Sequence, residues 1–312
     1  MKLGCTSAAY SASFRRGLSL GDWLRICARE LDADGVEFAV ADLPAVDARE
    51  LRSLKRQATD LHLTIASIGV EADLYDDAGR PREIERVKQA CDIAAYIGAP
   101  VLRLDIGAVR DRHAAAPDGR IVGLFRRVFG ERQPDKRRLW SDVMWSLRAC
   151  ADYGGERGVT LALENGRQGT LVGSGPVLAQ AVNDVGSPWL RCCVEPASMQ
   201  TPAGIDLAIA SAVLARTPFR SVSDDGADAA LYWPEQLRGL HLRGYRGFVL
   251  LDYAGAEDAA TALPRAARYM RGLMHLLQRQ ELLPDKHEPS GNGRTPHEAA
   301  EAVRRPAPTA KR

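Results

Sequence analysis

Short apolar runs alternate along this chain with longer segments in which apolar residues recur every three or four positions. The short runs predict buried β-strands, and the longer segments predict amphipathic helices. Helices are expected over residues 20–33, 47–60, 81–97, 135–153, 174–184, 204–215, 233–242 and 257–280. The predicted strands are Leu3 to Thr6, Gly35 to Phe38, Thr64 to Ile68, Val101 to Asp105, Thr160 to Glu164, Arg191 to Glu195, Phe219 to Ser223 and Phe248 to Asp252.

The order of these elements predicts the fold. Strict alternation of strand and helix requires parallel pairing with right-handed crossovers. A doubly wound sheet would also use these elements, but eight repeats with a final helix that closes the ring favour an α/β fold of the (β/α)8 TIM-barrel type. We expect residues 1–283 to form one barrel domain, and the polar, proline-containing residues 284–312 to be disordered. The arginine-rich connection 107–133 has the length of a binding loop or lid.

Composition narrows the class of protein. The chain has 312 residues, 46% of them hydrophobic and 26% charged, and its formal net charge of +2 gives no electrostatic case for nucleic-acid or membrane binding. Six cysteines are scattered without a C-x-x-C pair, and the N-terminus lacks the apolar segment of a signal peptide. These features predict a cytoplasmic protein with reduced thiols. Neighbours on a strand face opposite sides, so Cys192 and Cys193 are expected to be separate small apolar groups.

Three of the predicted strands end in an acid. Apolar runs deliver Glu164, Glu195 and Asp252 at what would be the carboxyl end of a parallel barrel, where such folds place their chemistry. Clustered carboxylates are costly to bury unless positive charge lies between them. A divalent metal or a cationic group on a substrate would supply that charge. The alternative is that the acids pair with arginines at the barrel mouth.

Other polar residues at strand ends are candidates for substrate contacts. Alternation in the fourth strand places Arg103 and Asp105 on the same side. Arg103 is suited either to a substrate hydroxyl, carboxylate or phosphate, or to an internal ion pair with Glu37, Glu71 or Asp105. Glu37 and Glu71 either line the cavity or are solvated loop acids. Asn165 either contacts a substrate or serves the turn that follows its strand.

The order and spacing of several motifs resemble the sugar phosphate isomerase/epimerase family, the xylose-isomerase-like barrels. The resemblance covers most of residues 1–280, and no single motif is specific by itself. It is carried by Gly35-Val36-Glu37, Ile65-Ala66-Ser67-Ile68-Gly69, the segment 94–104, Leu161-Ala162-Leu163-Glu164-Asn165 and Gly244-Tyr245-Arg246-Gly247-Phe248-Val249.

The resemblance implies a divalent metal held by acids after the fifth, sixth and eighth strands and by a histidine after the seventh. Glu164, Glu195 and Asp252 match the three acids, with Asp252 one methylene shorter than the family's Glu. Residues 219–225 contain no histidine, and Gly166 stands where the family often has another. Asp224 or Asp225 would then donate an oxygen in place of the histidine. Oxygen ligands of this kind favour Mn or Mg.

The resemblance also implies an activity in carbohydrate metabolism. The metal would polarise a sugar carbonyl, and Glu164 and Asp252 would act as the acid/base pair that forms and reprotonates an enediolate. A dehydratase or lyase would begin with the same proton abstraction. A non-catalytic or metal-free barrel that binds a small ligand or supports a partner subunit is the alternative from another class. A nuclease-type barrel would need more histidines and a basic face. The expected partner is a small sugar-like molecule, and a homo-oligomer is a family-level expectation.

Overall fold

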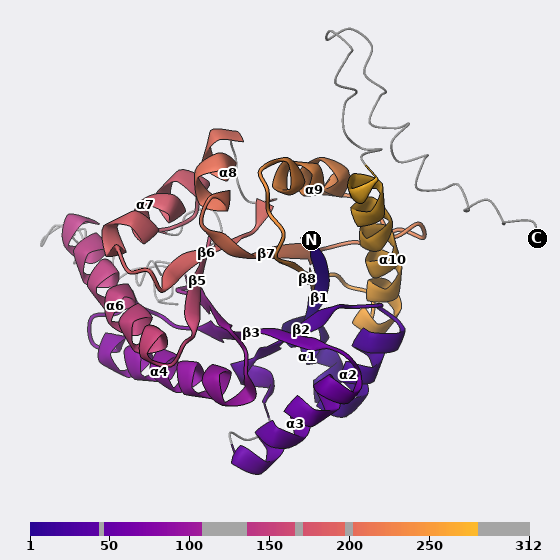
Figure 1. Cartoon of the computed structure of the whole chain (residues 1–312), viewed down its shortest axis with the longest axis horizontal. Helices are drawn as coiled ribbons and strands as arrows, with labels where there is room; N and C mark the ends of the chain where they lie inside the picture. Colours follow the sequence, from indigo (N-terminus) through magenta and orange to yellow (C-terminus); the bar gives the residue numbers. More distant parts are fainter. Residues whose placement is uncertain (44–46, 108–135, 166–170, 197–201, 280–312) are drawn as a thin grey trace, which may run out of the picture.

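The computed structural model describes residues 1–43, 47–107, 136–165, 171–196 and 202–279. Within this part of the chain, eight parallel strands pair in chain order and close into a barrel, with β8 beside β1 (Figure 1). The predicted (β/α)8 fold is therefore confirmed. The strands are β1 (Lys2–Thr6), β2 (Gly35–Ala39), β3 (Thr64–Glu71), β4 (Val101–Asp105), β5 (Thr160–Glu164), β6 (Leu190–Val194), β7 (Ala212–Phe219) and β8 (Phe248–Tyr253).

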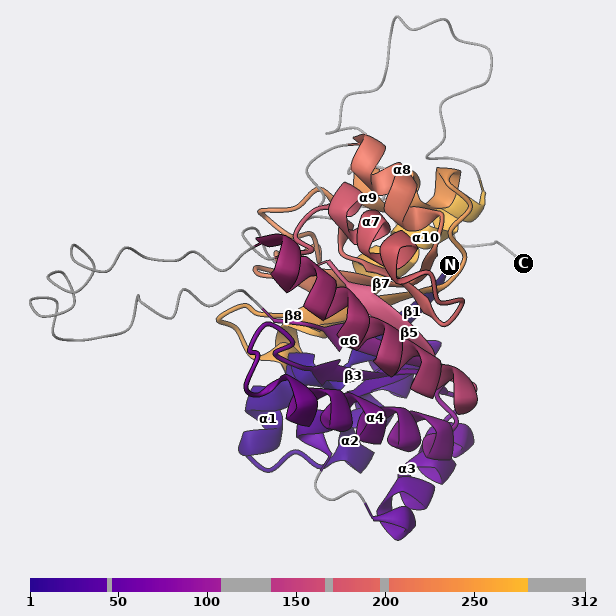
Figure 2. The same cartoon turned by 90° about the vertical axis from the view of Figure 1, so that its left-hand side faces the viewer.

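Helices surround the ring of strands, and α4 and α6 lie side by side on its outer face (Figures 1 and 2). The predicted tail 284–312 and the predicted loop 107–133, apart from Gly107, lie outside the described residues. The described helices are η1 (Ser7–Tyr10), α1 (Ser11–Arg15), α2 (Leu20–Arg29), η2 (Val40–Asp42), α3 (Ala48–Asp60), α4 (Arg80–Ile97), α6 (Lys136–Glu156), α7 (Gly175–Val185), α8 (Pro202–Ile209), α9 (Trp233–Leu242) and α10 (Ala259–Gln278).

Helix α4 shows how local sequence sets the element boundaries. Pro81 lies in its first turn, where a missing N–H costs nothing. Gly98 ends the helix with a φ of 86°, a left-handed conformation that glycine adopts without a Cβ clash. Both boundaries match the sequence prediction to within one residue.

The predicted seventh strand, Phe219 to Ser223, is wrong. Helix α8 ends at Ile209, well before the predicted end at 215, and β7 begins at Ala212. The alanine-rich run across this boundary has high helix propensity, which favoured a longer helix. Pro218 disfavours helical geometry at the residue before it, and pairing with β6 and β8 places residues 212–219 in the sheet.

The buried apolar residues form two clusters, a small one inside the barrel and a large one between the strands and the helices. Cys193 belongs to the small inner cluster with Ala162, Leu214 and Leu250, whereas Cys192 belongs to the large cluster between strands and helices. The two neighbours therefore face opposite sides, as predicted. All six cysteines are buried and free. No described helix has the length and apolar character needed to span a membrane.

Candidate functional site

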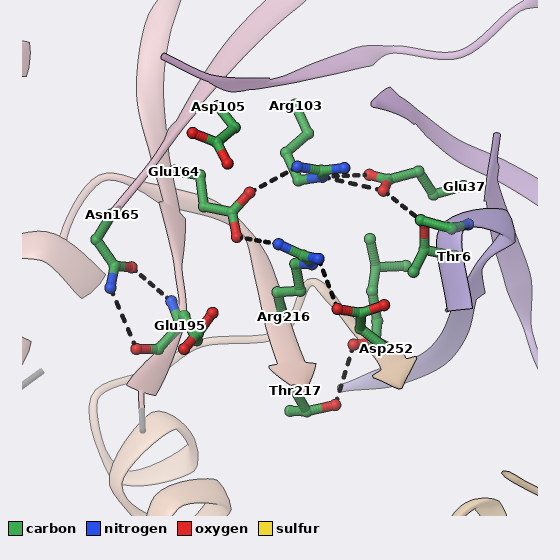
Figure 3. A network of polar contacts seen from close by, with 12 residues as sticks. Thr6, Glu37, Arg103, Asp105, Glu164, Asn165, Glu195, Arg216, Thr217 and Asp252 are labelled. Atoms are coloured by element: carbon green, nitrogen blue, oxygen red, sulfur yellow. Dashed lines mark hydrogen bonds and ion pairs between the residues drawn. The ribbon is translucent and has the colours of Figure 1, made fainter. Parts of the chain in front are cut away.

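A chain of ion pairs crosses the inside of the barrel toward the carboxyl ends of its strands (Figure 3). Five charged side chains form it, and each comes from a different strand. We call them the central cluster: Glu37 from β2, Arg103 from β4, Glu164 from β5, Arg216 from β7 and Asp252 from β8.

At one end of the central cluster, Glu37 is completely buried and fully bonded. Arg103 Nε donates to both carboxylate oxygens at 3.0 and 3.1 Å. The hydroxyls of Thr6 and Ser67 donate to the same two oxygens at 2.9 and 2.7 Å. Gly69 leaves room for the guanidinium, because a Cβ at that position would lie 2.5 Å from Arg103 Nη2. The internal ion pair of Arg103 with Glu37, one of the two interpretations left open by the sequence, is present.

Glu164 joins the two guanidiniums of the central cluster. Its Oε2 accepts from Arg103 Nη1 at 2.6 Å, and its Oε1 accepts from Arg216 Nη1 at 2.5 Å. The other end of the Arg216 guanidinium, Nη2, donates to Asp252 Oδ2 at 2.5 Å. One guanidinium therefore bridges an acid of β5 and an acid of β8. Planar, fork-shaped donors suit such paired recognition, whereas a lysine ammonium does not.

These contacts fix the charge of the buried groups. Burial acts to raise the pKa of Glu164, but the guanidiniums of Arg103 and Arg216 outweigh it and hold that pKa below its ordinary value. Burial acts to lower the pKa of Arg216, and the carboxylates of Glu164 and Asp252 reverse this, so its pKa is raised. The acid between the two arginines is therefore ionised at neutral pH, and the arginines stay charged.

A pH-dependent stability follows from Glu164. Because its pKa is lowered on folding, its contribution to the free energy of unfolding is complete above the ordinary value near pH ~4.3 and is lost as the pH falls toward the folded value. Urea unfolding between pH 7 and 3 should show a larger free energy of unfolding for wild type than for Glu164→Gln, and this difference should shrink as the pH falls. Glu85→Gln, a change at an exposed acid, is the matched control. A difference between wild type and Glu164→Gln that is independent of pH would contradict this assignment.

The central cluster is reachable from its Asp252 end. The side chains of Arg216 and Asp252 are 18% and 10% exposed, whereas those of Arg103 and Glu37 are 4% and 0% exposed. Arg216 Nε is buried and has no hydrogen-bond acceptor among the described residues. Each Nη of Arg216 carries two N–H groups and donates once within the central cluster, so the guanidinium at the open end retains donor capacity for an added oxygen.

Asp105, Asn165 and Glu195, three predicted site residues, lie beside the central cluster (Figure 3). Asp105 and Asn165 form hydrogen bonds to backbone groups. Asp105 Oδ1 accepts from the Gly107 N–H at 2.7 Å. Asn165 is buried, and its side-chain amide forms two hydrogen bonds with the backbone of Glu195. Its Oδ1 accepts from Glu195 N at 2.6 Å, and its Nδ2 donates to Glu195 O at 3.4 Å. Asn165 therefore joins the ends of β5 and β6, the turn role that the sequence left open.

The remaining candidates are not brought to the central cluster. Glu71 ends β3 with an exposed side chain. Asp224 and Asp225 are exposed in the turn after β7, and Asp225 Oδ1 accepts from Ser223 Oγ at 2.5 Å. The expected substitution of one of these aspartates for the missing histidine is thus not supported, because the turn directs them into surface contacts.

Arg216 is the residue that sequence reasoning missed. The predicted helix ends at residue 215 and the predicted strand begins at Phe219, so Arg216 falls between the two predicted elements. The available signal was the alternation of Leu214, Arg216 and Pro218, which shares one face of a strand and precedes a proline.

The donors present do not fit the divalent metal that the resemblance implies. Both oxygens of Glu164 and one oxygen of Asp252 accept from guanidiniums. The β7 side chain that joins them is an arginine, which has no lone pair for a metal. Across the described residues, no group of three histidine, cysteine, aspartate or glutamate side chains is arranged to hold a metal ion.

Comparisons with solved structures find the same fold in several sugar epimerases. The structure of L-ribulose 3-epimerase is similar with a TM-score of 0.70 and 17% identity, over 92% of this chain and 99% of that one. D-psicose 3-epimerase from Clostridium cellulolyticum H10 gives a TM-score of 0.67 and 16% identity, over 91% and 99%. The 3-keto-D-glucoside 4-epimerase of E. coli gives 0.67 and 14%, over 87% and 99%. At these identities the likeness shows the fold.

A comparison with curated proteins gives no match. The family model described as xylose isomerase-like TIM barrel matches residues 27–279, which is most of the chain and all strands from β2 to β8. That match agrees with the closed eight-stranded barrel. The chain belongs to the xylose isomerase-like TIM barrel family.

Proposed function

We propose that this protein isomerises or epimerises a sugar, or a related polyhydroxy carbonyl compound, by moving a proton with its own charged side chains. The observation that carries the proposal is the placement of Arg216 and Asp252. They are bonded to each other at 2.5 Å and are the two most exposed members of the central cluster. A fixed positive donor beside a carboxylate is the arrangement that proton abstraction next to a carbonyl needs.

In the proposed reaction, the Arg216 guanidinium binds the substrate carbonyl oxygen, and Asp252 removes the proton from the adjacent carbon. The electron pair of the broken C–H bond forms the enediolate, whose negative oxygen stays against the guanidinium. Return of the proton from Asp252 to the former carbonyl carbon gives the isomer, when the hydroxyl proton of the adjacent carbon also moves to the former carbonyl oxygen. Return of a proton to the original carbon from the opposite face gives the epimer and needs a second acid.

Glu164 takes a different role from the acid/base role that the resemblance implies. Both of its oxygens accept charged hydrogen bonds, and its pKa is lowered, so it is a weak base at neutral pH. In this proposal Glu164 is a positioning residue that holds Arg216 toward Asp252. Proton transfer at the exposed end is assigned to Asp252.

The charge of the central cluster supports a neutral substrate. Three carboxylates face two guanidiniums, so the five groups together carry a formal charge of −1. A phosphorylated sugar would bring further negative charge toward these carboxylates. The similar structures named above are epimerases of sugars or of a keto-glucoside. We therefore propose that unphosphorylated sugars are the preferred class.

The test is product formation with protein stripped of metal. Wild-type protein should convert at least one member of a panel of neutral aldoses and ketoses, detected by chromatography. Asp252→Asn should lower the rate by about 10²–10⁴-fold, the usual contribution of a positioned acid or base. Asp224→Asn, a change of the same type in an exposed turn, is the matched control. Equal rates in Asp252→Asn and wild type would contradict the assignment.

The complete pairing of Glu164 also favours a second candidate, a barrel that binds a sugar without converting it. In that case the panel gives saturable binding and no new product. A dehydratase or lyase would begin with the same proton transfer but release water or a carbon fragment, so product analysis separates these classes.

A further inference from the structure

We infer that the Arg216 guanidinium occupies the place of a divalent cation between Glu164 and Asp252, so that Arg216 and a bound metal exclude each other. Arg216 then supplies the positive charge between these two acids whether or not a sugar is converted.

Acids from strands on opposite sides of β7 meet one group, with Nη1 of Arg216 2.5 Å from Glu164 Oε1 and Nη2 2.5 Å from Asp252 Oδ2. A metal ion bound by both carboxylates would need these same oxygens within about 2.0–2.6 Å of itself. The guanidinium and the ion therefore compete for the same lone pairs.

A guanidinium stays protonated under all ordinary conditions, and the two acids raise the pKa of Arg216 further. Arg103 adds a second buried positive charge on the other oxygen of Glu164. A divalent cation added to the central cluster would change its formal charge from −1 to +1 and would lie beside two guanidiniums in a weakly screened environment. The chain thus already supplies the positive charge that Glu164 needs.

Arg216 lies two residues before Pro218, the residue that pairs with Asp252, so its long side chain runs along the barrel toward the mouth. A histidine at position 216 would be shorter and would carry a lone pair. It would also free Glu164 Oε1 and Asp252 Oδ2, while Glu164 Oε2 would keep its contact with Arg103. One substitution should therefore exchange a guanidinium site for a metal site.

The experiment is calorimetric titration of EDTA-stripped protein with Mn²⁺ alone. Wild-type protein should show no binding that depends on Glu164. Arg216→His should bind one Mn²⁺ at least about tenfold more tightly than wild type, a change of about 1.4 kcal/mol. Arg220→His, the same change at an exposed arginine after the same strand, is the matched control and should behave as wild type.

Two results would overturn the inference. One is stoichiometric Mn²⁺ binding by wild type that is lost in Glu164→Gln. The other is folded Arg216→His, with the circular dichroism of wild type, that gains no binding. If Arg216→His does not fold, Arg216→Ala takes its place. The wild-type titration needs neither variant, because stoichiometric Mn²⁺ binding that depends on Glu164 would overturn the inference by itself. Absence of sugar conversion would not alter any of these readouts.

Discussion

Arg103→Met is expected to destabilise the protein by about 3–5 kcal/mol, the usual cost of removing one partner from a buried ion pair. The reason is that Glu37 is completely buried and depends on Arg103 for its counter-charge, while Glu164 loses one of its two guanidiniums. Urea unfolding at neutral pH measures the loss. Arg157→Met, which removes an exposed arginine paired with Asp92, is the control and should have a small effect.

A double-mutant cycle separates this ion-pair effect from lost packing. If the penalty is an uncompensated Glu37 charge, then Arg103→Met combined with Glu37→Gln should cost less than the sum of the two single changes. Additive costs would mean that Arg103 contributes by filling space alone. The cycle also tests whether the hydroxyls of Thr6 and Ser67 are enough to hold an uncharged amide at position 37.

Arg216→Lys is expected to lower the turnover of any accepted sugar by about 10²–10³-fold, the usual effect of removing one donor from a developing oxyanion. A lysine ammonium keeps the positive charge but cannot span Glu164 and Asp252 as the fork of Arg216 does. Steady-state kinetics should show the loss mainly in kcat. Wild-type turnover in Arg216→Lys would remove Arg216 from the proposed reaction and leave it a structural role.

The sequence predicted the barrel because each apolar run and each amphipathic segment has its own local signal. It also predicted that Glu164 and Asp252 lie at the carboxyl ends of their strands, because an acid after a buried run marks such an end. The position of β7 was wrong, since alanine-rich sequence across residues 208–215 supports either a helix or a strand. Only pairing with β6 and β8 decides between them, and pairing is a non-local property.

The identity of the positive group could not be obtained from the sequence for the same reason. The sequence required positive charge among the strand-terminal acids and left open a metal, a substrate cation or arginines at the barrel mouth, without indicating which arginine. The structure places Arg216 there, and its partners Glu164 and Asp252 are separated from it by 52 and 36 residues. Which arginine meets which acid depends on strand register and on the inward face of β7, neither of which follows from composition or spacing.

We propose that the chain's own charged side chains move the substrate proton: Asp252 removes it, and Arg216 stabilises the enediolate oxygen. The most direct measurement is incorporation of deuterium from heavy water into a neutral ketose, followed by NMR with EDTA-treated protein. The account predicts exchange at the carbon next to the carbonyl that persists in EDTA and falls at least a hundredfold in Asp252→Asn. Exchange that appears only after a divalent metal is added, and that disappears in Glu164→Gln, would contradict it.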